Sequence, residues 1–342
     1  MSESTIEIIE RSLEKRGSLG KREARLVLID KSLELSSLLA ITDRLRRRHS
    51  GNHIRLCSIV NARSGGCRED CAFCAQSAHY RTRVKRYRLL TSEKLVEAAR
   101  DAERSGAGEF SIVTSGVSFA TEQEIVSVER ALKQIGGNCN GIQRCTSLGR
   151  VEPKVLNRLK AAGLDCFHHN LETCRDFFPS ICTTHCYEDR VEMVRRIKAA
   201  GLRVCSGGIS GMGESPEDRV ALALELAALD VDSVPLNFLN PVTGTPLEGA
   251  DYLTPVDCLR LIAMFRLVLP DKDIIVCGGR EVNLRDLQSM IFFAGANGIL
   301  IGNYLTTEGR NARDDLKMLA DLGLEPYYDK KRDRRQSRQA KG

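Results

Sequence analysis

The feature that most limits the fold of this chain is a regular alternation of short apolar runs with longer amphipathic segments. The segments between the runs begin with helix-capping residues such as Thr91, Thr121 and Ser215, and several end in glycine. Eight runs have the character of strands: 54–60, 109–114, 141–146, 165–170, 203–207, 233–238, 273–278 and 298–301. Strands and helices in this order predict an α/β protein, a (βα)8 TIM-type barrel.

A doubly wound parallel sheet uses the same alternation and is the alternative architecture. It is disfavoured because the first strand is not followed by a GxGxxG turn. In a barrel, the binding site is formed by the C-terminal ends of the strands and by the loops that follow them. We therefore expect the reactive residues of this chain at that rim.

Three segments are expected along the chain. Residues 1–50 form an N-terminal helical extension, because 23–30 and 32–40 carry apolar residues at helical spacing. Residues 51–322 form the barrel. Residues 323–342 form a C-terminal segment with a basic, disordered tail, since seven Lys or Arg and two Asp fall in 329–342. A solvated tail is favoured over one that binds nucleic acid.

Composition narrows the class of protein. No apolar run reaches the roughly 18 residues of a transmembrane helix, so no membrane partner is expected. The first residues lack the basic and apolar regions of a signal peptide, which predicts a cytoplasmic protein. Disulfides are not expected in that compartment, so the 13 cysteines are interpreted as buried small side chains or metal ligands.

Three cysteines, Cys67, Cys71 and Cys74, lie close together in the loop after the first predicted strand. Thiolates suit iron–sulfur clusters, zinc or copper(I). Structural zinc sites and closed [4Fe–4S] clusters take four protein ligands, whereas three leave one metal position open. The motif, with Phe73 before its last cysteine, resembles the radical S-adenosylmethionine (SAM) superfamily. The resemblance implies that the open iron binds SAM, that its cleavage releases a 5′-deoxyadenosyl radical, and that Phe73 lies beside the adenine.

Two further motifs fall at strand ends. A glycine-rich turn, 205–214, follows the fifth strand and resembles the SAM-adenine turn of the superfamily through Gly208, Gly211 and Gly213. An ordinary strand-to-helix turn is the other interpretation. After the fourth strand, Asn170 and Glu172 share a face because they are two residues apart, and can hydrogen-bond a ligand.

Isolated cysteines occur at the ends of three odd-numbered predicted strands: Cys145, Cys205 and Cys277. Alternate strands of a (βα)8 barrel contribute side chains to one layer, so these thiols are expected to converge. Cys182, in the loop after strand four, is a candidate fourth member. The other isolated cysteines, Cys166 among them, are interpreted as small buried side chains.

Taken together, these motifs resemble the biotin synthase family, over about residues 53–324 of the chain. Further matching segments are 233–247, 279–281 and 294–298. The resemblance implies conversion of dethiobiotin to biotin, with sulfur supplied by an auxiliary iron–sulfur cluster. It also implies a homodimer, and a reducing electron donor such as flavodoxin or ferredoxin. By matching positions, Asn170, Glu172 and Arg190 contact SAM, and Asn170 and Asn237 contact the substrate. The family usually has Asn at His168 and Asp at Glu172.

The auxiliary cluster is where this chain departs from the well-known form of the family. That form uses three cysteines and an arginine, but two of the four positions fall at Ser111 and Ile275. The hypothesis is an all-cysteine cluster held by Cys145, Cys182, Cys205 and Cys277, of a four-iron type rather than [2Fe–2S]. It resembles the variant found in anaerobes.

Two other functions remain open at this point. Another radical SAM enzyme with the same barrel would act in hydrogenase maturation or amino-acid rearrangement. A non-catalytic iron–sulfur or zinc protein would not cleave SAM at all.

Overall fold

Residues 3–116, 121–250 and 253–327 are described by the computed structural model of the chain. The basic tail falls outside these residues. In the described part of the chain, the longest helices are too short or too polar to cross a bilayer.

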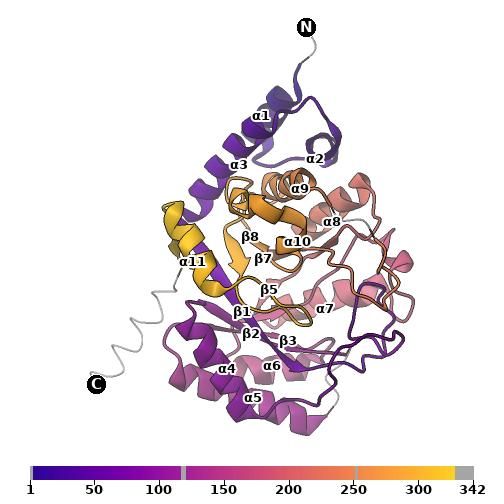
Figure 1. Cartoon of the computed structure of the whole chain (residues 1–342), viewed down its shortest axis with the longest axis vertical. Coiled ribbons are helices and arrows are strands. Elements are labelled where there is room, and N and C mark those ends of the chain that lie inside the picture. Colours follow the sequence, from indigo (N-terminus) through magenta and orange to yellow (C-terminus); the bar gives the residue numbers. More distant parts are fainter. Residues whose placement is uncertain (1–2, 117–120, 251–252, 328–342) are drawn as a thin grey trace.

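A closed parallel barrel forms the body of the molecule (Figure 1). Its sheet runs in the order β1-β2-β3-β4-β5-β7-β8-β9, and β9 pairs with β1 to close it. The strands are β1 (His53–Arg63), β2 (Glu109–Thr114), β3 (Gln143–Ser147), β4 (Cys166–His168), β5 (Arg203–Cys205), β6 (Gly208–Ser210), β7 (Ser233–Phe238), β8 (Asp273–Val276) and β9 (Gly298–Leu300). The predicted (βα)8 barrel is confirmed.

Helices surround the barrel between successive strands (Figure 1). They are α4 (Ser92–Arg104), α5 (Glu122–Asn138), α6 (Pro153–Ala161), α7 (Tyr187–Ala199), α8 (Pro216–Ala228), α9 (Pro255–Val268), α10 (Arg280–Leu284) and α11 (Ala312–Asp321). The predicted caps Thr91, Thr121 and Ser215 each accept a hydrogen bond from a first-turn backbone amide. Gly279 is the N-cap of α10, and a 3₁₀ helix, η2 (Arg285–Ile291), follows α10.

The fifth and fourth strands are shorter than predicted. The fifth is interrupted after Cys205 and resumes as β6, which also pairs with β7. The fourth ends at His168, and the chain then turns so that Glu172 has φ 71°. This positive φ is incompatible with a continuing strand. Both interruptions occur at the C-terminal rim, beside the cavity described below.

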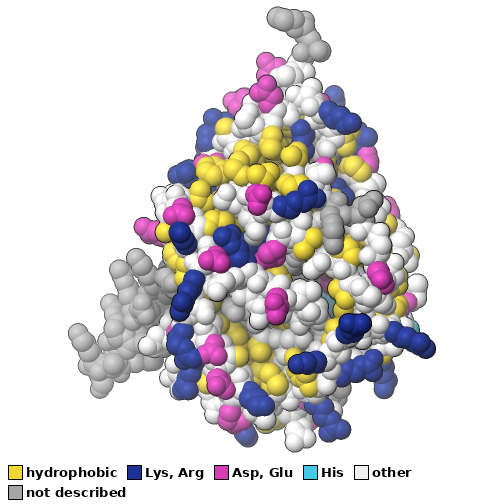
Figure 2. Space-filling view, viewed as in Figure 1, with side chains coloured by type: hydrophobic (Ala, Val, Ile, Leu, Met, Phe, Trp, Pro, Cys, Tyr) yellow, Lys and Arg dark blue, Asp and Glu magenta, His cyan; other side chains and the backbone are white. Residues whose placement is uncertain are grey.

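Three helices precede the barrel, as expected for the N-terminal extension: α1 (Thr5–Arg16), α2 (Lys21–Ile29) and α3 (Leu35–Ser50). They lie at one end of the molecule, where α2 and α3 pack on α9 (Figure 1). Residues 261–268 of α9 are all buried because they lie between these helices and the barrel. Arg260 adds hydrogen bonds to the carbonyl oxygens of Val27, Asp30 and Leu33. In Figure 2 a band of hydrophobic side chains lies over this end of the molecule.

A charged network closes the N-terminal end of the barrel. Arg55 Nε lies 2.7 Å from Asp273 Oδ2, and its Nη1 lies 2.5 Å from Glu109 Oε1. Asp273 also accepts a hydrogen bond from Asn297 Nδ2 at 2.7 Å and lies 3.0 Å from His49 Nε2. Buried charges are stable when they are paired in this way. A short strand, β10 (Glu325–Pro326), pairs with β1 at this end.

Candidate active site

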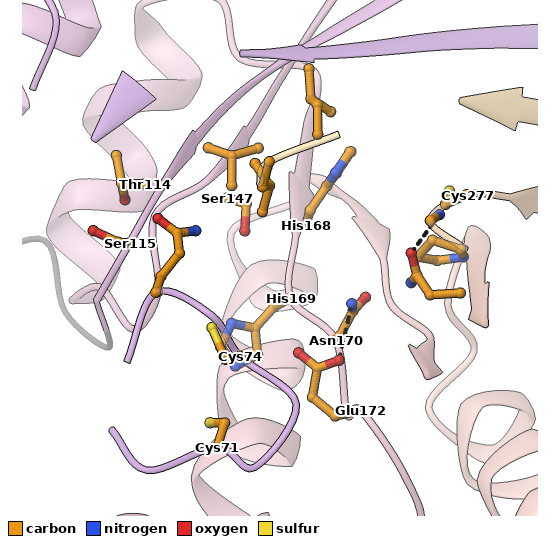
Figure 3. A pocket seen from close by; sticks show the side chains of 18 of the residues that line it. Cys71, Cys74, Thr114, Ser115, Ser147, His168, His169, Asn170, Glu172 and Cys277 are labelled. Atoms are coloured by element: carbon orange, nitrogen blue, oxygen red, sulfur yellow. Dashed lines mark hydrogen bonds between the residues drawn. The ribbon is translucent and has the colours of Figure 1, made fainter. Parts of the chain in front are cut away.

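A cavity of about 420 Å³ opens at the C-terminal ends of the barrel strands (Figure 3). Its walls come from eight strands, β1 to β5 and β7 to β9, and from the loop after β1. Asn170 and Glu172 lie across the cavity from the loop that carries Cys71 and Cys74 (Figure 3). The site is therefore at the rim where the sequence predicted it.

The cysteine loop brings Cys67, Cys71 and Cys74 to the cavity wall. The loop folds back on itself, because Cys67 N donates to Gln76 O at 3.0 Å and Cys74 N donates to Cys71 O at 2.9 Å. Burial, with a smaller contribution from the neighbouring Cys67, raises the pKa of Cys74 to about 11. Buried neighbouring thiols become thiolates when a soft cation compensates their charge. This donor set fits an iron–sulfur cluster.

The opposite wall presents a charged triad made by Asn170, Glu172 and Arg190. Arg190 Nη1 donates to Asn170 O at 3.0 Å and lies 3.5 Å from Glu172 Oε1. Asn170 Nδ2 donates to Glu172 Oε2 at 3.3 Å. Burial raises the pKa of Glu172, and Arg190 and Asn170 offset part of that effect. The triad offers a carboxylate, an amide and a guanidinium to a polar ligand.

Backbone contacts with the glycine-rich turn hold Glu172 in place. Glu172 N donates to Gly207 O at 3.1 Å, and Ile209 N donates to Glu172 O at 2.8 Å. A Cβ on Gly208 would lie 2.3 Å from Glu172 O, so only glycine permits this approach. Among the described residues that line the cavity, none is Gly208, Gly211 or Gly213. Gly208 thus acts on the site through Glu172.

Phe73 and Asn237 line the same cavity. Asn237 is oriented by two backbone groups, because its Oδ1 accepts from Gly278 N at 2.9 Å and its Nδ2 donates to Gly208 O at 3.2 Å. Each end of an amide can form one more hydrogen bond. Asn237 can therefore still contact a bound molecule.

A second group of thiols lies in the barrel interior. Cys145, Cys166 and Cys205 pack together and are buried. The sulfurs of Cys145 and Cys166 and a ring nitrogen of His168 all lie within 4.8 Å of one another. Burial lowers the pKa of His168, but the adjacent Cys205 and Cys166 more than offset this and raise it. The group could hold a second metal centre.

Cys277 lies close to this group but packs with Cys57 rather than with Cys145. Both Cys205 and Cys277 line the cavity, as does His168. Cys205 and Cys277 each raise the pKa of Cys57, so the three side chains are electrostatic neighbours. The structure thus brings two of the cysteines predicted at odd strands together and places the third beside them.

Cys182 lies elsewhere. Its sulfur is 3.8 Å from Cys71 Sγ and 3.2 Å from His185 Nδ1, and these three residues form their own compact group. It does not belong to the described lining of the cavity. Cys182 was expected to join Cys145 and Cys205. It lies instead against Cys71 of the three-cysteine loop.

Cys166 lies beside Cys145, which the sequence did not indicate. It was interpreted as a small buried side chain, yet it is the register partner of Cys145 on the next strand. Ser111, where the well-known form has a cysteine, is the partner of Cys145 on the other side. The usable signal was its position within strand four, two residues before His168.

Two comparisons of sequence identify relatives. Residues 62–226 match the Radical SAM superfamily, and residues 235–325 match the Biotin and Thiamin Synthesis associated domain. A biotin synthase of Geobacter sulfurreducens is 52% identical over 310 residues, which are 91% of this chain and 94% of that protein. This chain belongs to the biotin synthase family. A biotin synthase of Pelotomaculum thermopropionicum is 52% identical over 292 residues, 85% of this chain and 90% of that protein.

Solved structures share the fold of this biotin synthase family member. Methylornithine synthase superposes with a TM-score of 0.79 at 20% identity, over 93% of this chain and 97% of that one. A maturase of the [FeFe]-hydrogenase gives 0.78 at 17% identity, over 95% of this chain and 75% of that one. At such identities the likeness concerns the barrel alone.

Proposed function

We propose that this chain is a biotin synthase that inserts sulfur into dethiobiotin by radical SAM chemistry. The observation that carries the proposal is the meeting of three neighbouring thiols and a half-buried polar triad at one cavity, which Cys205 of the second thiol group also lines. The identity to curated biotin synthases over nine-tenths of the chain supports the choice of reaction.

Cys67, Cys71 and Cys74 would hold a [4Fe–4S] cluster. A cluster bound there supplies the electron that splits SAM and so generates the 5′-deoxyadenosyl radical. Cys182 is not a fourth ligand in this arrangement, because it lies behind Cys71 and outside the described cavity wall. Cys67, Cys71 and Cys74 all line the cavity, so a molecule bound there could reach a metal position that the three thiolates leave open.

The polar triad would bind and orient SAM. Arg190 is suited to the carboxylate of the methionine part, since a guanidinium pairs well with a carboxylate. Glu172 and Asn170 are suited to the ribose hydroxyls, and Phe73 offers a ring to the adenine. The turn through Gly208, Gly211 and Gly213 would support this wall by fixing the Glu172 backbone.

Dethiobiotin would lie deeper in the cavity, with its ureido group at Asn237. Unactivated C–H bonds resist acid–base chemistry, so the chain's task is to position the carbons and exclude water. His168 lines this end of the cavity where the family usually has Asn. We assign it to the thiol group rather than to the ureido contact.

The sulfur donor would be an auxiliary cluster in the barrel interior. Cys145, Cys205 and Cys277 are retained from the sequence hypothesis as ligands. Cys166 takes the place of Cys182, since it lies within 4.8 Å of Cys145 whereas Cys182 lies at Cys71. Four thiolates are a usual ligand set for a four-iron cluster, and they differ from the three cysteines and one arginine of the well-known form.

The test is an anaerobic assay of the reconstituted protein with SAM, dethiobiotin and a chemical reductant, quantifying biotin and 5′-deoxyadenosine. We expect both products. Deoxyadenosine without biotin would indicate another radical SAM reaction, and absence of both would indicate a non-catalytic protein. The electron donor, the oligomeric state and the route of cluster repair are each determined by separate experiments.

A further inference from the structure

A second loop is clasped against the cysteine loop and holds Cys182 in place. Ala72 N donates to Ile181 O at 2.8 Å, which joins the residues that follow Cys71 and precede Cys182. Asp70 Oδ1 accepts from Thr183 N at 2.9 Å. Hydrogen bonds between the two loops, and not only contacts of its own side chain, therefore fix the position of Cys182.

Charged side chains add to these contacts between the loop of Cys182 and the cysteine loop, which together are called the clasp below. Glu69 Oε2 lies 2.5 Å from His185 Nδ1 and accepts from Thr184 Oγ1 at 2.6 Å. Asp70 Oδ1 also accepts from Thr184 N at 3.2 Å. Carboxylates from the cysteine loop thus bind the loop of Cys182 in several places.

The result is a close pair of buried thiols. Cys71 Sγ and Cys182 Sγ are 3.8 Å apart, and the two residues are 8% and 4% exposed. A disulfide bond is about 2.0 Å long, so the two sulfurs, which are 3.8 Å apart, need to approach each other by about 1.8 Å.

We propose that Cys182 is a resolving thiol for Cys71: when the cluster is absent, oxidation joins the two in a disulfide that reversibly blocks this position. The proposal rests on the proposed function only in taking Cys71 as a cluster ligand. It gives a role to Cys182 and to the clasp, which are not part of the cavity wall or of the proposed auxiliary cluster.

The chemistry is thiol–disulfide exchange with a small-molecule disulfide. Of the two thiols, Cys71 is the one that lines the cavity, so a small disulfide that enters the cavity meets it before Cys182. Its thiolate attacks one sulfur and releases one small thiol. The Cys182 thiolate then attacks Cys71 Sγ, forms the internal disulfide and releases the second small thiol. Both electrons and both protons pass to the small disulfide, which is reduced to two thiols.

Such a bond would protect the site. A free ligand thiolate can be oxidised irreversibly to sulfinic or sulfonic acid, whereas a disulfide is restored by thiols. It would also prevent cluster insertion until reduction frees Cys71. The cluster-free enzyme would then wait in a form that can be recovered.

The test uses cluster-free protein treated with oxidised glutathione, alkylated and digested with trypsin without reduction. Cleavage at arginines releases Cys71 with Cys74 in the peptide 69–81 and Cys182 with Cys186 in the peptide 176–190, and fragmentation of the joined peptides identifies the linked cysteines. We expect these peptides to be joined. Cys182→Ala should reduce the joined species to background.

Cys186→Ala is the matched control, because Cys186 is in the same peptide but exposed at the start of α7. It should leave the joined peptides unchanged. Oxidised wild-type protein should bind iron and sulfide at the three-cysteine site only after treatment with dithiothreitol, whereas oxidised Cys182→Ala should carry glutathione on the peptide 69–81 in place of the internal disulfide. Joined peptides that persist in Cys182→Ala, or iron uptake by the oxidised wild type equal to that of reduced protein, would overturn the proposal. Neither readout depends on biotin formation.

Discussion

Cys145 on β3 lies beside Cys166 on β4 because the two residues are register partners in the parallel sheet. Register partners in a parallel sheet point to the same side, so both thiols enter the barrel interior with Cys205. This relationship changes which cysteine is expected to complete the auxiliary cluster.

Iron content should distinguish the two ligand sets. Cys166→Ala removes a proposed auxiliary ligand, so iron in the anaerobically reconstituted protein should fall from about eight to about four atoms per chain. Cys277→Ala should lower it too. The sequence alone predicted the same loss for Cys182→Ala, but the structure predicts no loss there. Mössbauer spectroscopy with iron and sulfide analysis makes the measurement.

The control is Cys258→Ala, which removes a buried thiol of α9. Loss of iron in Cys182→Ala but not in Cys166→Ala would show that Cys182, and not Cys166, is the fourth ligand.

Glu172→Gln should weaken SAM binding. The substitution keeps the shape of the side chain but removes the charge that pairs with Arg190 and is proposed to accept from the ribose. Hydrogen bonds to charged groups contribute about 1.5–3 kcal/mol, so the Kd should rise at least tenfold. Calorimetry of the cluster-loaded protein measures it. Glu192→Gln, on the surface of α7, should leave the Kd unchanged. Equal Kd values for wild type and Glu172→Gln would remove Glu172 from the SAM site.

Asp315→Ala should strongly destabilise the C-terminal part of the barrel. Asp315 on α11 pairs with Arg280 on α10 through two hydrogen bonds of 2.9 and 2.8 Å, and both side chains are fully buried. Removal of one partner leaves a buried charge, which costs about 3–5 kcal/mol. Urea unfolding of the cluster-free protein measures the loss. Asp314→Ala, the adjacent position on α11, should cost far less, and similar losses for both would argue against the ion pair.

Asp273 should make stability depend on pH in the acid range. Burial raises the pKa of Asp273, but the hydrogen bond from His49 and the charge of Arg55 outweigh it and lower the pKa to about 2. A lowered carboxyl pKa contributes stability above the unfolded pKa of about 4, and this is lost as the pH falls towards 2. Asp273→Asn should therefore be less stable than wild type by about 2 kcal/mol at pH 7, and by about half as much at pH 3. Urea unfolding at both pH values tests this, and a constant difference would contradict it.

Much of the architecture was predictable from local patterns. Strands β2 and β7 begin and end where the apolar runs predicted, at 109–114 and 233–238. The fourth strand was predicted too long, because the chain leaves the sheet after His168 to place Asn170 and Glu172 at the cavity. Apolar periodicity does not indicate such an early strand end, because the end depends on how residues from several strands form the cavity wall.

The candidate site was predictable where its residues are close in sequence. Cys67, Cys71 and Cys74 share one loop, so their spacing alone placed them together. Asn170 and Glu172 also line the cavity, but a turn after His168 places them there rather than the alternation of a strand. Cys166 and Cys182 were assigned differently from their observed surroundings. Their neighbours, Cys145 and Cys71, come from other strands and loops.

By itself, the order of residues determined the barrel, its helical caps and the three-cysteine loop, because helix capping, strand patterning and loop spacing are local properties of the chain. The tertiary structure decided which distant thiols meet. Register between β3 and β4 set Cys166 beside Cys145, and the hydrogen-bonded clasp of two loops set Cys182 beside Cys71. Contacts of this kind depend on strand register and loop packing, and these are determined only when the whole barrel closes.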